Sequence, residues 1–231
     1  SSKNTGPTVL AAACYVSDYE TESLLLFMPT DHLIDNDDEF LKCLDRVVSK
    51  KFTTNISTLG VKPTRPETRY GYIEVQKTTN DSIGISKGFV EKPDEVTVKE
   101  MLSKGNYLWN TGIFICKQSL IKKYFKEFAP YLLENVSSAV EKKVRDLNFW
   151  KLDETHWSHC QSISVDYAIM EKISYLNVVE FREGWNDMGN WEAVWKEGKK
   201  DEKNCFIKGS VSFKDCQNSL LISEDPNREL A

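Results

Sequence analysis

The sequence predicts an α/β fold in which helices cover a mixed β-sheet. Short continuous apolar runs alternate with segments of helical periodicity along residues 1–200. Two strand-like segments flank a polar stretch, as in a β-hairpin, which gives the sheet an antiparallel pair. From residue 201 to residue 231, short strands and turns replace helices. We therefore expect one α/β domain at 1–200 and the start of a separate β segment at 201–231.

The N-terminal elements alternate helix and strand. Residues 8–16 (TVLAAACYV) predict a helix capped by Thr5 or Gly6. The apolar run SLLLFMP at 23–29 is typical of a strand covered on both faces. Residues 35–51 begin with acids and end with lysines, which complements the dipole of a helix.

The central elements follow the same alternation. Residues 56–61 (ISTLGV) predict a strand, and 71–77 with 84–93 predict the hairpin around the polar residues TTNDS. Asp94 is placed to cap the next helix, and Gly105 to end it.

The later elements complete the layers. Residues 110–117 (NTGIFICK) predict a strand, and two helices separated by Pro130 follow it. Residues 164–173 (SVDYAIMEKI) predict a further helix, and residues 176–183 (LNVVEFRE) a further strand.

Composition excludes several classes of protein. The formal net charge of -5 argues against nucleic-acid binding, which usually needs a basic face. The longest apolar stretch, LLLFM, is far shorter than the roughly 20 residues that span a bilayer, and the N-terminus lacks the pattern of a signal peptide. Six scattered cysteines without a CxxC pair predict reduced thiols in a cytoplasmic protein.

One short segment offers a separate metal-binding hypothesis. His156, His159 and Cys160 in HWSHC could supply three ligands, but no further ligand pair lies nearby in the sequence. A polar helix or loop is the simpler interpretation of this segment.

Polar residues lie at several predicted strand ends, where open α/β sheets bind ligands. These residues are Asp31 after LLLFMPT, Glu91 and Lys92 after GFV, Asn110 before TGIF, and Asp187 after VVEFREGWN. Two asparagines and two tryptophans surround Asp187, which is more than a helix cap needs and suggests a divalent cation. The sequence contains neither GxxxxGK[ST] nor GxGxxG, so a phosphate-binding loop of those kinds is absent from the 231 residues.

Seven ordered motifs extend this picture across nearly the whole chain. They are NTGPTVLAAA, MPTDHLI, GVKPTRPETRYGYIE, FVEKPD, GNYLWNTGIFICK, SVDYAIMEK and GWNDMGNWEAVW. Their order and spacing resemble bacterial mannose-1-phosphate guanylyltransferases, which are sugar-nucleotide pyrophosphorylases. The resemblance implies a Rossmann-like three-layer nucleotide-diphospho-sugar transferase fold with a mixed, mostly parallel sheet.

The resemblance also implies a reaction. Mannose 1-phosphate would attack the α-phosphorus of GTP in line, giving GDP-mannose and pyrophosphate with help from Mg²⁺ or another divalent cation. Asp31 and Asp187 would be the metal ligands, with both indoles packed beneath the Asp187 loop. Each acid could instead serve as a turn or helix cap.

The implied sugar-phosphate site draws on several motifs. Glu91 would accept hydrogen bonds from sugar hydroxyls, Lys92 would contact the phosphate and act in catalysis, and Asn110 would hold further hydroxyls. The remaining implied substrate residues are Gly71, whose lack of a side chain admits the sugar, Thr111 and Asp166.

Each of these residues also has a structural alternative. Glu91 and Lys92 could be surface charges at a strand end, Asn110 a turn amide, and Asp166 a helix cap.

The nucleotide half of the implied site is sparse. Asn4 and Thr5 match a family motif near the nucleotide, as does Asp31, although capping explains the first two equally well.

The sequence departs from the family at several places. The family opens with a strand and a glycine-rich Arg/Lys loop that this sequence lacks, so we expect an N-terminally incomplete fold and no turnover by these residues alone. The isomerase domain of some relatives is not seen. Arg69, where the family usually has glycine, could reach a phosphate or be a surface arginine.

Two other functions remain open. The chain could be a pyrophosphorylase for another pair, such as glucose 1-phosphate with UTP or dTTP. It could also be a non-catalytic relative that binds sugar nucleotides. We expect GTP, mannose 1-phosphate and GDP-mannose as partners, neither nucleic acid nor membrane, and a homodimer as one candidate assembly.

Overall fold

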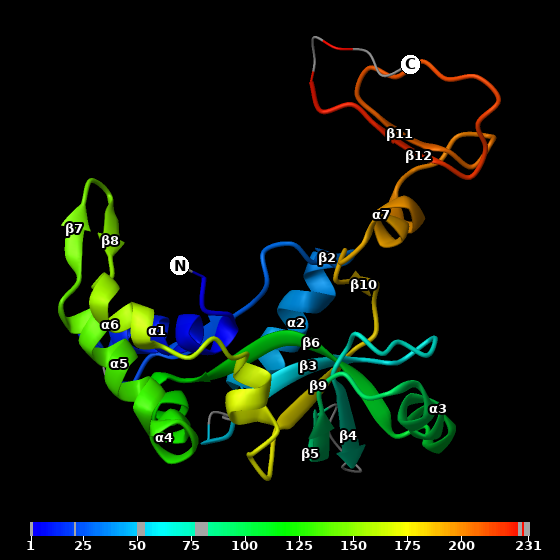
Figure 1. The fold of residues 1–231 in the computed structure, drawn as a ribbon. Helices are drawn as coiled ribbons and strands as arrows, with labels where there is room; N and C mark the ends of the chain where they lie inside the picture. The colour runs from blue at the N-terminus through cyan, green and yellow to red at the C-terminus, as the bar shows by residue number, and fades with distance from the viewer. Residues whose placement is uncertain (1, 21, 50–53, 77–82, 226–227, 229–231) are drawn as a thin grey trace. The chain divides into compact units, whose positions relative to one another are not determined.

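The computed structural model describes residues 2–20, 22–49, 54–76, 83–225 and 228 (Figure 1). The chain forms two compact units. Unit 1 comprises Ser1–Pro29 with Asn36–Glu183, and unit 2 comprises Thr30–Asp35 with Gly184–Ala231. The boundary near residue 200 that the sequence suggests stays a prediction.

Helices of unit 1 form where the sequence patterns place them. The helix that follows Asp35 has acidic residues in its first turn and Arg46 in its last turn, which complements the helix dipole. Asp94 caps the helix Glu95–Lys104 by accepting a hydrogen bond from the Thr97 amide at 2.8 Å. Gly105 ends that helix in the left-handed region, with φ of 69°. The helices are α1 (Thr5–Ser17), α2 (Asp37–Ser49), α3 (Glu95–Lys104), α4 (Gln118–Phe128), α5 (Pro130–Glu141), α6 (Glu154–His159) and the π-helical turn η2 (Asp166–Met170).

Two helix predictions need correction. Asn4 caps α1, not Thr5 or Gly6, because its side chain accepts a hydrogen bond from the Thr5 amide at 2.7 Å. The segment predicted as an ordinary helix at 164–173 contains the π-helical turn η2 instead.

The main sheet of unit 1 is mixed, as predicted. Its strand order is β1-β6-β3-β9-β5-β4, and β4 also pairs with β6. In this sheet β3 and β9 pair in parallel, whereas β6 and β5 run antiparallel to their neighbours. Strands β1, β3, β9 and β4 therefore share one direction, which agrees with the mostly parallel sheet expected. The strands are β1 (Leu24–Phe27), β3 (Ser57–Val61), β4 (Tyr72–Gln76), β5 (Ile83–Val90), β6 (Tyr107–Lys117) and β9 (Asn177–Phe181).

The predicted hairpin of β4 and β5 is present as an antiparallel pair, while its connecting residues TTNDS lie outside the described residues. A second hairpin, β7 (Val144–Asp146) with β8 (Phe149–Lys151), had no clear sequence signal.

Strand β1 is less covered than its apolar sequence suggests. It pairs with β6 at the edge of the sheet, and Leu24 and Leu26 are 37% and 42% exposed. The prediction of a strand covered on both faces is therefore wrong, because a continuous apolar run does not distinguish an edge strand from a central one.

Helices pack on both faces of this sheet. Figure 1 shows α1, α4 and α5 grouped together, and Leu10, Phe125 and Val136 from these helices share one core with Phe114 of β6. Ile113 and Ile115 alternate with Phe114 and so face the other side, where α2 contacts β9. The three-layer α/β architecture expected from the sequence is confirmed.

Unit 2 is smaller and contains short elements. Strand β2 (Leu33–Ile34) pairs with β10 (Trp185–Asn186), and Asn190 caps α7 (Trp191–Glu197). The strands β11 (Phe206–Lys208) and β12 (Leu220–Ile222) pair in parallel, which agrees with the expected β character of the C-terminal segment. Across the described residues of both units, no helix is long and apolar enough to cross a bilayer.

Candidate active site

The turn after β5 carries the first pair of candidate residues. The Glu91 side chain is 9% exposed, whereas that of Lys92 is 57% exposed, and the Lys92 ammonium lies 3.3 Å from Glu91 Oε1. Lys92 has φ of 49°, an uncommon left-handed conformation for a residue with a side chain. The turn thus keeps the Glu91 carboxylate inside and leaves the Lys92 cation accessible.

Gly71 forms a wall beside this carboxylate. A Cβ at position 71 would lie 2.6 Å from Glu91 Oε2 and 3.3 Å from Asn110 Cβ. The carbonyl oxygen of Gly71 accepts a hydrogen bond from the Asn110 amide at 2.8 Å. A side chain at position 71 would displace the Glu91 carboxylate, so the glycine gives this carboxylate its room, while the approach of the sugar to Gly71 stays a prediction.

Asn110 lies in an irregular part of β6 that the neighbouring strand β3 stabilises. The register between these strands shifts at Thr58 and Gly60, and the Thr58 hydroxyl donates to the Ile113 carbonyl at 2.9 Å. Asn110 Nδ2 donates to Asp166 Oδ1 at 3.0 Å. Bulges often re-aim a side chain next to a functional site, and this one turns Asn110 toward η2.

Thr111 takes part in the same irregularity. Its buried hydroxyl donates to the Leu59 carbonyl at 2.9 Å and accepts from the Ile113 amide at 3.3 Å. The hydroxyl predicted to bind substrate is thus occupied by the backbone around Asn110.

Asp166 and Glu91 form a pair of carboxyl groups in a partly buried setting. Burial raises the pKa of Asp166 to about 7, and the nearby Glu91 carboxylate adds to the rise. Burial also raises the pKa of Glu91, although Lys92 opposes this. With a pKa of about 7, Asp166 is divided between its protonated and ionised forms at neutral pH, so its carboxyl group can donate to or accept from a sugar hydroxyl.

Glu171 is a further residue at this site that sequence reasoning missed. Its Oε1 accepts a hydrogen bond from the Glu91 amide at 2.9 Å. The signal was absent because Glu171 sits five residues beyond Asp166, a spacing that does not share a face in an α-helix.

Asn4 and Thr5 are joined to the segment that precedes Asp166. The Thr5 hydroxyl accepts from the Val165 amide at 2.9 Å, and the Ile163 carbonyl accepts from the Gly6 amide at 2.9 Å. Asn4 has φ of 67° and caps α1. These contacts support the capping interpretation of Asn4, and they tie the start of α1 to η2.

Both predicted metal ligands lie in unit 2. The β2–β10 ladder pairs Leu33 with Asn186, which brings His32 and its neighbour Asp31 toward the Asp187 end of the other strand. Trp185 Nε1 donates to His32 Nδ1 at 3.3 Å. Burial lowers the pKa of His32, whereas Asp31 and Asp187 each oppose this decrease, so both carboxylates lie near one imidazole.

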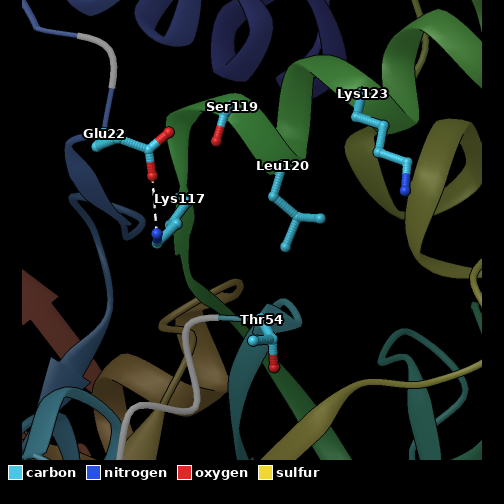
Figure 2. A pocket seen from close by; sticks show the side chains of 6 residues that line it. All are labelled: Glu22, Thr54, Lys117, Ser119, Leu120 and Lys123. Atoms are coloured by element: carbon cyan, nitrogen blue, oxygen red, sulfur yellow. Dashed lines mark hydrogen bonds and ion pairs between the residues drawn. The ribbon is translucent and has the colours of Figure 1, made fainter.

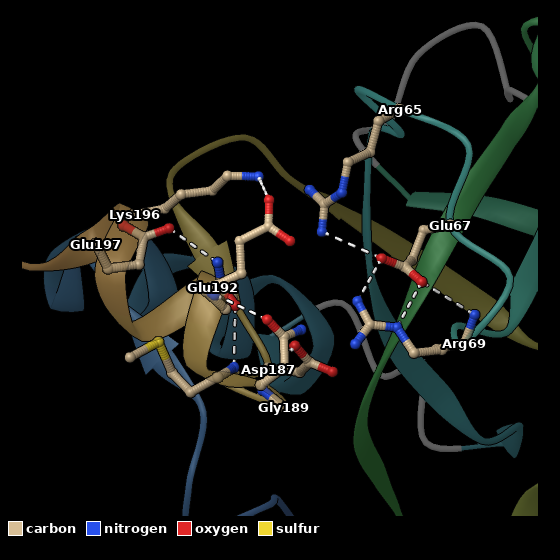
Figure 3. Close-up of polar contacts among 12 residues, drawn as sticks. Arg65, Glu67, Arg69, Asp187, Gly189, Glu192, Lys196 and Glu197 are labelled. Atoms are coloured by element: carbon tan, nitrogen blue, oxygen red, sulfur yellow. Dashed lines mark hydrogen bonds and ion pairs between the residues drawn. The ribbon is translucent and has the colours of Figure 1, made fainter. Parts of the chain in front are cut away.

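The surroundings of Asp187 bear on its structural alternative. Asp187 Oδ1 accepts from the Gly189 amide at 3.1 Å (Figure 3). Asn190, not Asp187, caps α7, so the helix-cap alternative does not hold for Asp187. Trp185 is half-buried against His32, but Trp191 is 68% exposed. The expectation that both indoles pack beneath the loop is therefore wrong for Trp191.

Arg69 forms an ion pair within unit 1. Its Nε and Nη2 donate to the two oxygens of Glu67 at 2.8 and 2.7 Å, and Arg65 contacts the same carboxylate at 3.4 Å (Figure 3). Hydrogen bonds and charge from Arg69, with further charge from Arg65, lower the pKa of Glu67 to about 2. Arg69 is thus part of a bidentate contact on the loop that leads into Gly71.

The HWSHC segment shows no metal-site geometry. His156 Nδ1 lies 2.5 Å from Asp153 Oδ1, and Cys160 is buried. Within the described residues, no group of three His, Cys, Asp or Glu side chains could hold a metal by itself. A two-carboxylate site would therefore need water or substrate oxygens to complete its coordination, as Mg²⁺ sites commonly do.

A cavity of about 350 Å³ lies elsewhere in unit 1, and none of the candidate residues lines it (Figure 2). The Lys117 ammonium within it is paired with Glu22 at 2.7 Å. Its lining residues are Glu22, Thr54, Lys117, Ser119, Leu120 and Lys123.

Comparison with known proteins identifies the family. Residues 1–204 match the nucleotidyl transferase family. The chain belongs to this family. It is 36% identical over 222 residues to the mannose-1-phosphate guanylyltransferase of Sinorhizobium fredii, which covers 96% of this chain and 43% of that protein. It is 33% identical over 221 residues to the alginate biosynthesis protein AlgA of Pseudomonas aeruginosa, which covers 95% of this chain and 46% of that protein. The nucleotidyl transferase chain thus spans about half the length of the curated relatives it matches.

Solved structures confirm the nucleotidyl transferase fold. The mannose-1-phosphate geranyltransferase of Thermus thermophilus has a TM-score of 0.76 at 26% identity, covering 96% of this chain and 66% of that one. The mannose-6-phosphate isomerase of Helicobacter pylori has a TM-score of 0.71 at 25% identity, and the match covers 80% of this chain and 71% of that one.

Proposed function

We propose that the chain carries the hexose phosphate and metal-ligand parts of a mannose-1-phosphate guanylyltransferase, which makes GDP-mannose and pyrophosphate from mannose 1-phosphate and GTP. The observation that carries the proposal is the convergence of Glu91, Asn110 and Asp166 around the bare backbone of Gly71. The choice of substrates is supported by similar proteins from S. fredii, Salmonella typhimurium and Escherichia coli, each of which is named a mannose-1-phosphate guanylyltransferase.

Each candidate residue of unit 1 has a proposed role in substrate binding. Glu91 accepts from sugar hydroxyls. Asn110 Oδ1 already accepts from the Thr58 hydroxyl and the Gly112 amide. Asn110 therefore contributes through Nδ2, which gives one hydrogen to Asp166 and has a second for a hydroxyl. The exposed ammonium of Lys92 neutralises charge on the sugar phosphate and so supports its attack on the α-phosphorus. Asp166, which is partly protonated near neutral pH, can donate to a hydroxyl that Glu91 does not serve.

Asp31 and Asp187 are proposed to hold a divalent cation. The donor set fits a hard cation, because both groups are carboxylates near one another at the β2–β10 ladder. When bound, such an ion would stabilise developing charge on the transferring phosphate. The Gly189 amide holds Asp187 in place by donating to its Oδ1.

The proposed cellular setting follows from the thiols. All six cysteines are free, and five of them are buried. Free thiols persist in reducing compartments, so we propose a cytoplasmic location, where GTP is also available.

A thermal-shift experiment tests this function. We expect GDP-mannose to raise the melting temperature in the presence of Mg²⁺, and Asp187→Ala to abolish that dependence on Mg²⁺ because the variant loses a ligand carboxylate. Glu202→Ala removes an exposed acid of the same unit and serves as the matched control. A shift that is independent of Mg²⁺ would favour a non-catalytic binding protein. A larger shift with UDP-glucose would favour another pyrophosphorylase.

A further inference from the structure

We propose that Glu171 is a positioning residue that fixes the Glu91–Lys92 turn for binding of the hexose phosphate. This inference rests on the proposed function of that turn. Glu171 Oε1 accepts a hydrogen bond from the Glu91 amide at 2.9 Å, although the two residues lie 80 positions apart in the sequence. The contact therefore joins η2 directly to the loop that presents Lys92.

The turn depends on contacts of this kind because its backbone is strained. Lys92 adopts φ of 49°, which is unfavourable for a residue with a Cβ. The following residue, Pro93, disfavours the helical region at position 92 and so limits the alternatives. The Glu171 carboxylate accepts from the Glu91 amide and so holds the residue immediately before Lys92, the strained position.

The π-helical geometry of η2 explains how Glu171 reaches this amide. The Glu171 amide donates to the Asp166 carbonyl at 3.0 Å, which closes a turn over five residues. In an α-helix, residues five apart point about 140° away from each other. The wider turn instead brings Asp166 and Glu171 to the same side, and both interact with Glu91.

Electrostatic attraction does not explain why Glu171 lies beside Glu91. Its carboxylate is a like charge beside Glu91 and contributes to the raised pKa of that residue. This like charge is nevertheless placed within 2.9 Å of a backbone amide, as expected for a group that sets geometry.

The test compares ligand affinity across matched variants. Glu171→Ala removes the acceptor, Glu171→Gln keeps an oxygen acceptor without the charge, and Asp153→Ala removes a similar carboxylate-to-amide bond at the start of α6. We expect Glu171→Ala to weaken mannose 1-phosphate binding about tenfold in calorimetry, the scale of one charged hydrogen bond. Glu171→Gln should recover most of this loss, and Asp153→Ala should bind like the wild type.

The amide proton signal of Glu91 gives a second readout that needs no ligand. We expect this signal to move upfield in Glu171→Ala and to return toward its original position in Glu171→Gln. Wild-type affinity in Glu171→Ala, or an unchanged Glu91 signal, would overturn the inference while leaving the proposed function intact. A wild-type chain that does not bind mannose 1-phosphate would overturn both.

Discussion

Gly71 shows how the absence of a side chain shapes the candidate site. Alanine at this position would push on the Glu91 carboxylate, since a Cβ would lie 2.6 Å from Oε2. We expect Gly71→Ala to cost about 1–3 kcal/mol of unfolding free energy, as overpacking does, and to weaken mannose 1-phosphate binding. Urea denaturation and calorimetry measure the two effects.

Gly88 provides the matched control for this substitution. It lies in the neighbouring strand, where the nearest atom to an added Cβ is Glu74 Oε2 at 4.0 Å. Gly88→Ala should change stability by less than about 1 kcal/mol and leave binding unaffected. Equal effects of the two substitutions would contradict a specific role for the Gly71 wall.

Asp166 should make the stability of the protein depend on pH. Its folded pKa of about 7 lies above its ordinary value of 3.8, so the folded state retains a proton that the unfolded state has released. The stabilisation is complete below pH 4 and is lost as the pH rises toward 7. Asp166→Asn cannot ionise, and it should be more stable than the wild type at pH 8 but not at pH 4.

Urea denaturation at these two pH values measures this difference. A stability difference that does not change with pH would show that Asp166 is ionised normally in the folded protein. Because the amide also replaces a proposed hydroxyl ligand, we expect the more stable variant to bind mannose 1-phosphate less tightly.

Single residues were the least predictable part of the site. The sequence indicated Glu91, Lys92 and Asn110 at strand ends and, through its family resemblance, Asp166, and the structure brings them together in unit 1. It gave no sign of Glu171, because that contact depends on a π-turn. The role of Arg69 was not predictable either, because a solvated loop arginine and a bidentate partner of Glu67 have the same sequence signature.

Among the elements, η2 makes a prediction of its own. Tyr167 lies within the turn and is 43% exposed, so its deletion removes the extra residue at little cost in buried surface. We expect the deletion to convert the turn to α-helical geometry, which places Glu171 four residues after Asp166 and so keeps both residues on one face. Binding of mannose 1-phosphate should therefore fall less than in Glu171→Ala, while circular dichroism shows a folded protein.

Tyr167→Ala is the control for this deletion. It removes the same side chain but keeps the residue count, so the π-turn and the wild-type affinity should both persist. If the deletion variant folds but binds mannose 1-phosphate as weakly as Glu171→Ala, a shared face for Asp166 and Glu171 is not what positions the site.

Elements with strong local signals were the most predictable. Helices α2 and α3 were evident from their charges and caps, and Pro130 marked the boundary between α4 and α5. The exposure of β1 and the hairpin β7–β8 were not evident, because edge position and short exposed strands leave little periodicity.

At the scale of the whole molecule, the candidate groups divide between the two units. Residues proposed to bind the hexose phosphate lie in unit 1, and the proposed metal ligands lie in unit 2. The sequence predicted the two sets by the order of their motifs but not this division, because Thr30–Asp35 joins the C-terminal unit through the β2–β10 ladder. Such long-range pairing is not visible in local sequence patterns.

The most direct test of the account is an NMR titration of the isotopically labelled chain with mannose 1-phosphate. We predict that amide signals of Gly71, Glu91, Asn110 and Asp166 shift together and saturate with one affinity. Perturbations confined instead to the cavity residues Lys117 and Lys123 (Figure 2), or no binding by a folded chain, would contradict the account.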